Sequence, residues 1–135
     1  MNAEGSAIYS TLQGTSAITA LLAGTTSIYH MQAPEGTTLP YIVFSTQAGG
    51  DLNESPHRVK DKTWFIRAYS DASAKEAGAI DDQIDAVLHL TPLTISGWAN
   101  LWLTRVADLE TVENDPPGTA IHMQGGFYRL VIEQN

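Results

Sequence analysis

Histidine is the side chain best suited to acid–base and metal chemistry near neutral pH, and this chain has four. They are His30, His57, His89 and His122. No two of them stand at the His-x-x-x-His spacing of a zinc-binding helix. His57 could act as a general base with Asp51 or Glu54, but the sequence offers no activated nucleophile and no Gly-x-Ser-x-Gly elbow. A small hydrolase or ligand-binding domain that uses His57 is therefore a remote alternative.

The carboxylates that come nearest to a metal cluster are Asp81, Asp82 and Asp85. Their spacing places them on the polar side of an amphipathic helix, so a solvated face is the favoured interpretation. The glycine pairs at 49–50 and 125–126 lack the following helix that would bind a phosphate. Cysteine is absent, which excludes disulfides and thiolate metal sites. We therefore predict no catalytic residue, no metal and no cofactor, and we expect that the chain is not an enzyme.

The charge of the chain argues against nucleic-acid binding. The formal net charge is −8, and of seven Lys and Arg residues three fall within 58–62 while the others are scattered. Sequence-independent DNA binding needs a clustered basic face, so we reject binding to DNA or to a membrane surface as the main activity. No apolar run approaches the roughly 20 residues that span a bilayer, and the start does not resemble a signal peptide. We expect a cytosolic product.

The elements that must position these side chains follow from the apolar spacing. Helical spacing predicts helices over residues 3–13, 16–24 and 74–88. The third begins at a capping box formed by Ser73 and Glu76, and His89 ends it at the surface. Ser16 is expected to cap the second helix, and the glycine pair at 125–126 suggests a bulge or bend in the last strand. Alternation and β-branched content predict strands over residues 28–31, 41–46, 63–69, 93–95, 98–109 and 120–133.

The predicted fold class is α+β, with an antiparallel β-sheet and one long helix and short N-terminal helices packed on one face. The length of 135 residues fits a single domain, 1–135. Two stretches lack periodicity and are expected to be long loops, Gln47 to Asp61 and Glu110 to Thr119. Trp98 and Trp102 share one face of a predicted strand, where core packing is the default, although exposed Trp also anchors interfaces.

Several segments follow one another in a characteristic order. The helical start leads into SAITALL at 16–22, and then come APEGTTLPYIVF at 33–44, WFIRAY at 64–69 and the helix at 74–88. This order resembles the tail completion, or tail terminator, proteins of long-tailed bacteriophages. The stretch Ala-Pro-x-Gly-x-x-x-Pro-Tyr-Ile-Val carries most of the likeness. The resemblance covers nearly the whole chain and departs from the usual pattern after Leu90, where residues 91–118 are longer and richer in Trp.

The resemblance implies a subunit of a hexameric ring. Such a ring would cap the finished tail tube, stop its polymerisation and offer a surface to the head–tail connector or stopper protein. The protein would belong to the tail or neck of a virion after synthesis in the host cytoplasm. Six copies would carry roughly −48 (6 × −8), so DNA would pass through the bore without specific binding. Another neck or tail protein, such as a head–tail stopper, is the nearest alternative.

Partner-binding surfaces are expected on the two predicted long loops, because loops of that length are usually functional. The loop from 47 to 61 also holds two of the seven basic residues, Arg58 and Lys60. The candidate partner-binding residues are Gln47, Asp51, Asn53, His57, Arg58, Lys60, Glu113 and Asp115.

Overall fold

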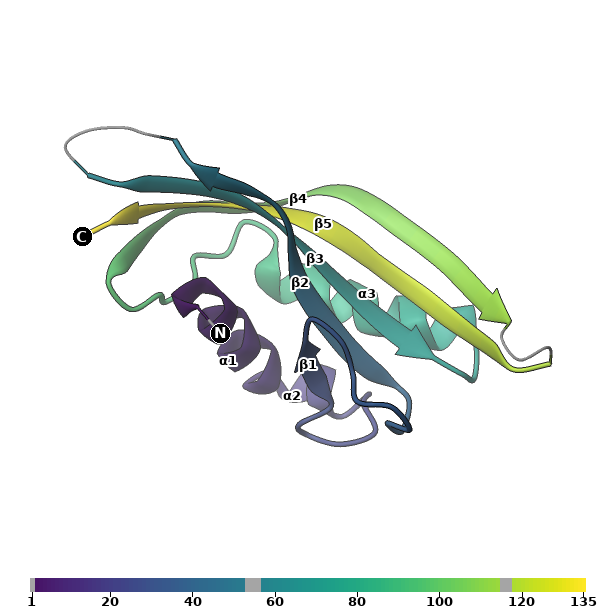
Figure 1. Ribbon diagram of the computed structural model, residues 1–135. Helices are drawn as coiled ribbons and strands as arrows, with labels where there is room; N and C mark the ends of the chain where they lie inside the picture. The colour runs from purple at the N-terminus through teal and green to yellow at the C-terminus, as the bar shows by residue number, and fades with distance from the viewer. Residues whose placement is uncertain (1, 53–56, 115–117) are drawn as a thin grey trace.

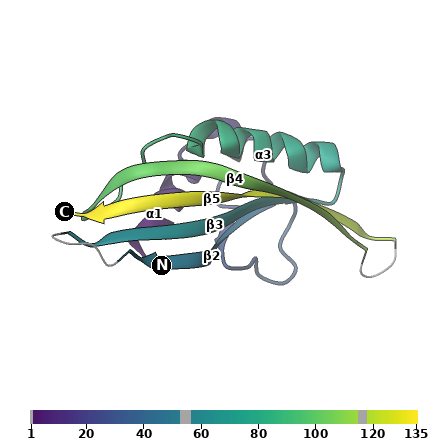
Figure 2. The ribbon, with the colours of Figure 1, turned by 90° about the horizontal axis from the view of Figure 1, so that it is seen from above.

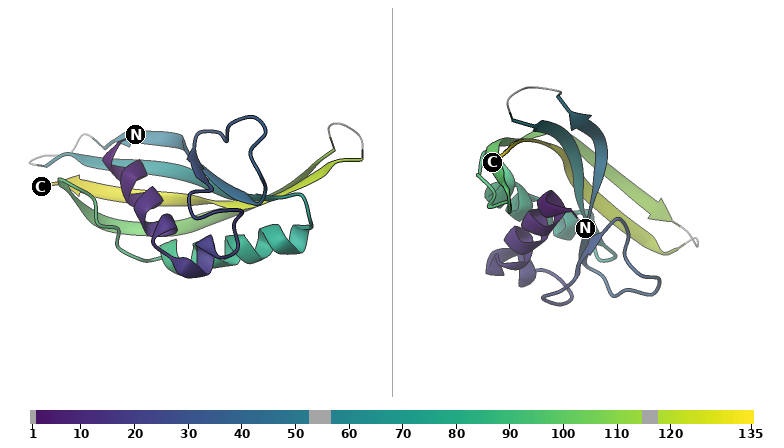
Figure 3. Two further views of the ribbon diagram at one scale, coloured as in Figure 1. Left: turned by 90° about the horizontal axis from the view of Figure 1, so that it is seen from below. Right: turned by 60° about the vertical axis from the view of Figure 1, so that its left-hand side comes forward.

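Helices and strands form two layers in the computed structural model, which describes residues 2–52, 57–114 and 118–135. In chain order the elements are α1 (Ala3–Gln13), α2 (Ser16–Thr19), β1 (Ile28–His30), β2 (Tyr41–Asp51), β3 (Val59–Ser70), α3 (Ala74–Leu88), β4 (Trp98–Asn114) and β5 (Ala120–Gln134). The helices lie on one side of a five-stranded sheet, and no described element covers the other side (Figure 1; Figure 3). The predicted α+β class is confirmed.

The sheet is mixed, which corrects the prediction of a wholly antiparallel one. Its strand order is β1-β2-β3-β5-β4. β1 pairs with β2 in parallel, with Ile28 opposite Ile42, and the other neighbours are antiparallel. A parallel neighbour needs a connection that carries the chain back to the start of the strand. Residues 31–40 provide this return, and they suffice because β1 is only three residues long.

The stretch from Gln47 to Asp61, predicted to be a loop, is largely a β-hairpin. Only residues 52–58 connect β2 to β3. The register shifts between Thr46 and Ala48, so Gln47 interrupts the alternation that would have revealed the strand. Gly49 has a φ of +120°, and a Cβ there would lie 2.2 Å from the carbonyl oxygen of Asp61. A glycine that suggested a turn thus allows close contact between two strands.

The second predicted loop is also wrong over half of its length, because β4 continues to Asn114 and pairs with β5 as far as Ala120. Cross-strand pairing stabilises residues whose polar side chains suggested a turn. The predicted strand at 93–95 forms only an isolated bridge between Ile95 and Trp98. Leu93 and Ile95 instead bury their side chains in the core.

The core lies between the helices and the covered face of the sheet. It joins α1, α3 and every strand of the sheet through large buried side chains, among them Ile8, Trp64, Ile84, Leu103 and Tyr128. The alternation predicted for β3 holds, since its residues 64, 66 and 68 are fully buried. The hydroxyl of Ser73 accepts a hydrogen bond from the backbone N–H of Glu76 at 3.1 Å, as in the predicted cap. The predicted cap at Ser16 is wrong, because the N-cap of α2 is Thr15.

The two hairpins project from opposite ends of the sheet, as Figure 2 shows from above the uncovered face. The β2–β3 hairpin lies at the end where the C-terminus emerges. The β4–β5 hairpin lies at the other end and runs beyond the last pairing of β3, between Ser70 and His122. Among the described residues, no helix is long and apolar enough to cross a membrane.

Candidate interaction surfaces

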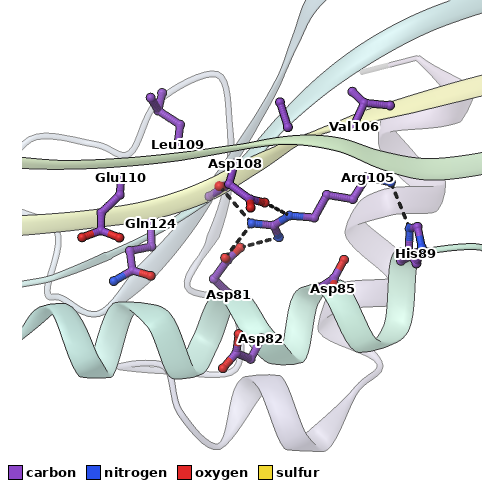
Figure 4. Close-up of a pocket in the computed structure, with 12 residues that line it drawn as sticks. Asp81, Asp82, Asp85, His89, Arg105, Val106, Asp108, Leu109, Glu110 and Gln124 are labelled. Carbon is purple, nitrogen blue, oxygen red and sulfur yellow. Dashed lines mark hydrogen bonds and ion pairs between the residues drawn. The ribbon is translucent and has the colours of Figure 1, made fainter.

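The polar network around Arg105 joins β4 to α3 at the root of the β4–β5 hairpin (Figure 4). The guanidinium donates two hydrogen bonds to the carboxylate of Asp81, at 2.9 and 2.8 Å. It also donates to Asp108 at 2.6 Å, to the hydroxyl of Tyr128 at 3.0 Å and to the carbonyl of Gly125 at 3.1 Å. All five N–H groups of the arginine are therefore satisfied, and the side chain is fixed.

This network corrects the prediction that Asp81 belongs to a solvated helix face. Asp81 is only 7% exposed, whereas Asp82 beside it is exposed. Gly126 makes room for the network, because a Cβ at that position would lie 2.5 Å from Cζ of Arg105. The alternative of a bulge in β5 at the glycine pair is wrong, since the nearest register shift falls on β4, between Arg105 and Ala107.

Burial and hydrogen bonding shift the pKa values of Arg105 and Tyr128 in opposite directions. Burial alone would lower the pKa of Arg105, but the hydrogen bonds to Asp81, Asp108 and Tyr128 outweigh it and raise the pKa. Burial raises the pKa of Tyr128 despite the hydrogen bond from Arg105. The arginine thus stays charged and the tyrosine neutral at physiological pH. Nδ1 of His89, just after α3, accepts the backbone N–H of Arg105 at 3.1 Å and attaches the helix end to β4.

An open, polar pocket of about 650 Å³ lies beside this network, between α3 and the root of the hairpin. Carboxylates dominate its walls, with Asp82, Asp85 and Glu110 facing it around the Arg105–Asp81 pair (Figure 4). Among the described residues, no three His, Asp or Glu side chains are arranged to hold a metal ion. The Arg105–Asp81 pair joins β4 to α3, and we call it the clamp.

The uncovered side of the sheet, which we call the open face, carries aromatic and arginine side chains. We define it by Tyr41, Ser45, Asp61, Phe65, Arg67, Tyr69, Trp102, Phe127 and Arg129. The rings of Phe65 and Phe127 stack with centroids 4.7 Å apart. Arg67 lies over Phe65 at 4.5 Å and donates hydrogen bonds to Tyr69 and Ser45, both at 3.0 Å. Exposed clusters of aromatic residues and arginine are typical of protein interfaces.

A second arginine organises the open face near the β2–β3 end. Arg129 donates to Asp61 at 2.9 Å and lies over the ring of Trp102 at 5.0 Å. The hydrogen bond from Arg129 holds the pKa of Asp61 below its usual value. Trp102 is 39% exposed, so it lies at the surface rather than in the core, which was the default expectation for this residue. Trp98, in contrast, packs against the core.

The β4–β5 hairpin carries acidic side chains together with exposed apolar ones. We call its described residues 108–114 and 118–123 the acidic arm, because they include Asp108, Glu110 and Glu113 and no Lys or Arg. Near its end Val112 is 52% exposed. The opposite end of the sheet holds the basic residues Arg58, Lys60 and Lys62. The two ends of the molecule thus differ in charge.

The structure places the predicted partner-binding residues at these two ends. Asp51 and Arg58 form an exposed ion pair at 2.6 Å, and Lys60 lies over the ring of Trp98 at 5.2 Å. Gln47, Asp51, His57 and Arg58 are exposed near the β2–β3 end, and Glu113 is exposed at the other end. Asn53 and Asp115 lie outside the described residues. His57 does not line the pocket beside Arg105, so the structure does not bring it to an enclosed site.

Sequence reasoning missed the open face and the clamp. The alternation Phe65-Arg67-Tyr69 was visible but did not show which side of the strand would lack a covering helix. The partner of Asp81 is 24 residues away on a strand, and no local spacing connects the two.

Comparisons with known proteins bear on the whole chain. Residues 6–124 match the family model described as tail completion protein gp17. A chain in the solved structure of the virion of a native gene transfer agent (GTA) particle shares the fold, with a TM-score of 0.80 and 17% sequence identity. The alignment covers 97% of this chain and 95% of that one. No curated protein sequence matches.

Proposed function

Because the chain belongs to the tail completion protein gp17 family, a family of phage tail structural proteins, we propose that it is a tail terminator. In this proposal the protein forms a ring, most simply of six copies, that caps the finished tail tube. The ring ends polymerisation of the tube and joins the tail to the head connector or stopper protein. The role requires binding surfaces rather than catalysis.

The family match over residues 6–124 is the observation that carries this proposal. Two features of the structure support it. The hairpins project from opposite ends of the sheet and leave the body of the subunit between them (Figure 2). The two ends also differ in composition, since the arm is acidic and the β2–β3 hairpin carries both acidic and basic residues, which favours association of one end of a copy with a different surface of the next. This is the kind of contact that closes rings.

The charge of the subunit also suits a ring around DNA. Each copy has a formal net charge of −8. Most arginines of known position are engaged in ion pairs or lie over aromatic rings, so few cations remain to hold phosphate groups. A bore formed by such subunits would repel the DNA backbone and let it move.

Binding to isolated tail tubes tests the proposal directly. The purified protein should bind the ends of tail tubes made of the matching tube protein, and electron microscopy should show a closed ring there. A head–tail stopper would instead bind proteins on the portal side and leave tube ends bare. A protein that stays monomeric and binds neither would contradict both roles.

A double variant tests the predicted docking role of the β2–β3 end. Reversing the charges of Arg58 and Lys60 to Glu should weaken binding to a neighbour or to the tube by about tenfold or more, while thermal unfolding changes little, because Arg58 is exposed. Asp82→Lys, a charge reversal on the exposed face of α3, is the matched control. Unchanged tail assembly in the double variant would remove this end from the interface.

A further inference from the structure

We propose that the acidic arm of one copy docks on the open face of a neighbouring copy and forms the repeating contact of the ring. The inference rests on the proposed ring and names the two surfaces that meet in it. The occupant of the open face is thus a second copy of this chain, and the contact pairs Glu113 of one copy with Arg67 of the next.

The composition of the open face suits an acidic, partly apolar partner. Arg67 is partly buried, and among the described residues its hydrogen bonds go to neutral acceptors, namely the hydroxyls of Tyr69 and Ser45 and the carbonyl of Phe65. Arg129 and Lys62 differ, since each contacts a carboxylate within the same copy, and Lys60 lies over the ring of Trp98. The positive charge of Arg67 is therefore available to an incoming carboxylate.

The aromatic rings beside Arg67 supply the apolar part of this surface. Phe65 and Phe127 stack across β3 and β5, and Tyr41 and Tyr69 continue the row, with ring centroids 5.3 Å apart. Gly125 lies against this row, where a Cβ would come within 2.6 Å of Cβ of Arg67. Without side chains at this point, β5 leaves the guanidinium and the rings accessible from above. Rigid aromatic rings around a cation are the composition of an interface anchor.

The acidic arm has the complementary composition. Of its three carboxylates, Asp108 is paired with Arg105 and Glu110 lines the pocket beside α3, while Glu113 is exposed near the tip. Exposed apolar side chains accompany them, of which Val112 is 52% and Leu109 is 38% exposed. Its end has only two strands, because β3 stops at Ser70. A two-stranded ribbon with exposed apolar residues gains stability when it packs against another surface. Glu113 lies near the tip, where it pairs with Ile121.

Among the described residues, the hydrogen bonds of Arg67 go to Tyr69, Ser45 and Phe65 and none goes to the arm of the same copy. The arm continues the plane of β4 and β5 and leaves the sheet at one end, as Figures 1 and 2 show. The root of the arm adjoins the open face, since Leu109 pairs with Gly125 and Met123 with Tyr69, so the contact proposed between copies is made by the tip of the arm. Such a heterologous contact repeats in one direction and closes into a ring when the rotation between neighbours allows it.

Charge exchange between two variants provides the test. Arg67→Glu and Glu113→Arg should each weaken self-association by at least about tenfold, since each places like charges in the contact. Mixed in equal amounts, the two should associate again to within about threefold of wild type, because an alternating ring restores opposite charges at every junction. Native mass spectrometry should then show equal numbers of the two variants in each ring. Arg67→Gln and circular dichroism verify that a loss is not caused by misfolding.

Cross-linking locates the contact independently of affinity. The chain has no cysteine, so single introduced thiols are unique. A short bismaleimide should join Val112→Cys of one copy to Ser45→Cys of another when the two variants are mixed. Lys75→Cys on α3 is the matched control and should give no product with Val112→Cys.

The outcomes separate this contact from the proposed function. Self-association that gives the cross-link and the recovery in the mixture supports the contact. Rings that form without the arm-to-face cross-link, or that Arg67→Glu leaves intact, overturn the contact while the terminator role stands. A chain that stays monomeric at high concentration and gives no cross-link also overturns it, and the binding to tail tubes then decides the function separately.

Discussion

Removing one partner of the Arg105–Asp81 pair should destabilise the fold strongly. The two side chains are only 13% and 11% exposed, so solvent screens the pair little. Breaking a buried ion pair typically costs about 3 kcal/mol or more, because the remaining charge has lost its partner. We therefore expect Asp81→Leu to lower the free energy of unfolding by about 3 kcal/mol, and Arg105→Met to lower it by a similar amount.

The double variant distinguishes a paired charge from two independent losses. Asp81→Leu with Arg105→Met leaves no buried charge unpaired, since Asp108, which also loses its partner, is exposed to solvent. Tyr128 and the Gly125 carbonyl still lose a donor. We expect a total cost of about 3 kcal/mol rather than about 6, which is a coupling energy of about 3 kcal/mol at the upper end for residues in contact.

Urea unfolding followed by tryptophan fluorescence measures these differences, since the chain has three Trp residues. Asp82→Leu is the control on the exposed side of the same helix and should change stability by less than about 0.5 kcal/mol. Single variants that cost less than about 1 kcal/mol, or a double variant that costs the sum of the two, would refute the view that Arg105 is a buried clamp.

Three further predictions follow from the geometry. Gly126→Ala should cost about 1–3 kcal/mol in a thermal melt, because its Cβ would meet the clamp guanidinium at 2.5 Å, whereas Gly50→Ala has open space and should be nearly neutral. Asp61 has a pKa lowered by Arg129, so it stabilises the fold above about pH 4 and less as pH falls; Asp61→Asn should flatten the decline of stability below that pH. Ser73→Ala should cost about 1 kcal/mol through loss of the helix cap.

Each of these three predictions has an outcome that would contradict it. Equal melting temperatures for the two glycine variants would show that the guanidinium shifts freely. Parallel stability curves for wild type and the Asp61 variant between about pH 4 and pH 2 would mean that the ion pair with Arg129 does not persist in solution. Full stability without the Ser73 hydroxyl would show that water replaces the cap.

Local patterns in the sequence predict the class of the fold but not its edges. The alternation of residues 63–69 and the cap at Ser73 are short-range signals, and the structure follows both. The parallel pairing of β1 depends on how residues 31–40 return, which no local pattern encodes. The hairpin ends were missed because a bulge at Gln47 interrupts the alternation, and because pairing across strands stabilises segments whose composition favours loops.

The candidate site was predictable only in part. Loop length alone pointed to both ends of the sheet, where Arg58 and Glu113 are exposed. The clamp could not be predicted, because helical spacing makes Asp81 look like its exposed neighbour Asp82 until a strand distant in sequence covers it. Which side of β3 would stay open depends on where the helices pack, and that is a property of the whole chain.

The Arg105–Asp81 clamp at the root of the acidic arm also fixes the angle between the arm and the body of the subunit. With all five donors of Arg105 engaged by β4, β5 and α3, the hairpin cannot pivot freely on the body. In a closed ring of six, each junction must turn by about 60°, and an error of a few degrees at each step accumulates around the circle. A stiff joint inside each subunit would therefore determine how many copies close the circle, and with it the diameter of the opening that they surround.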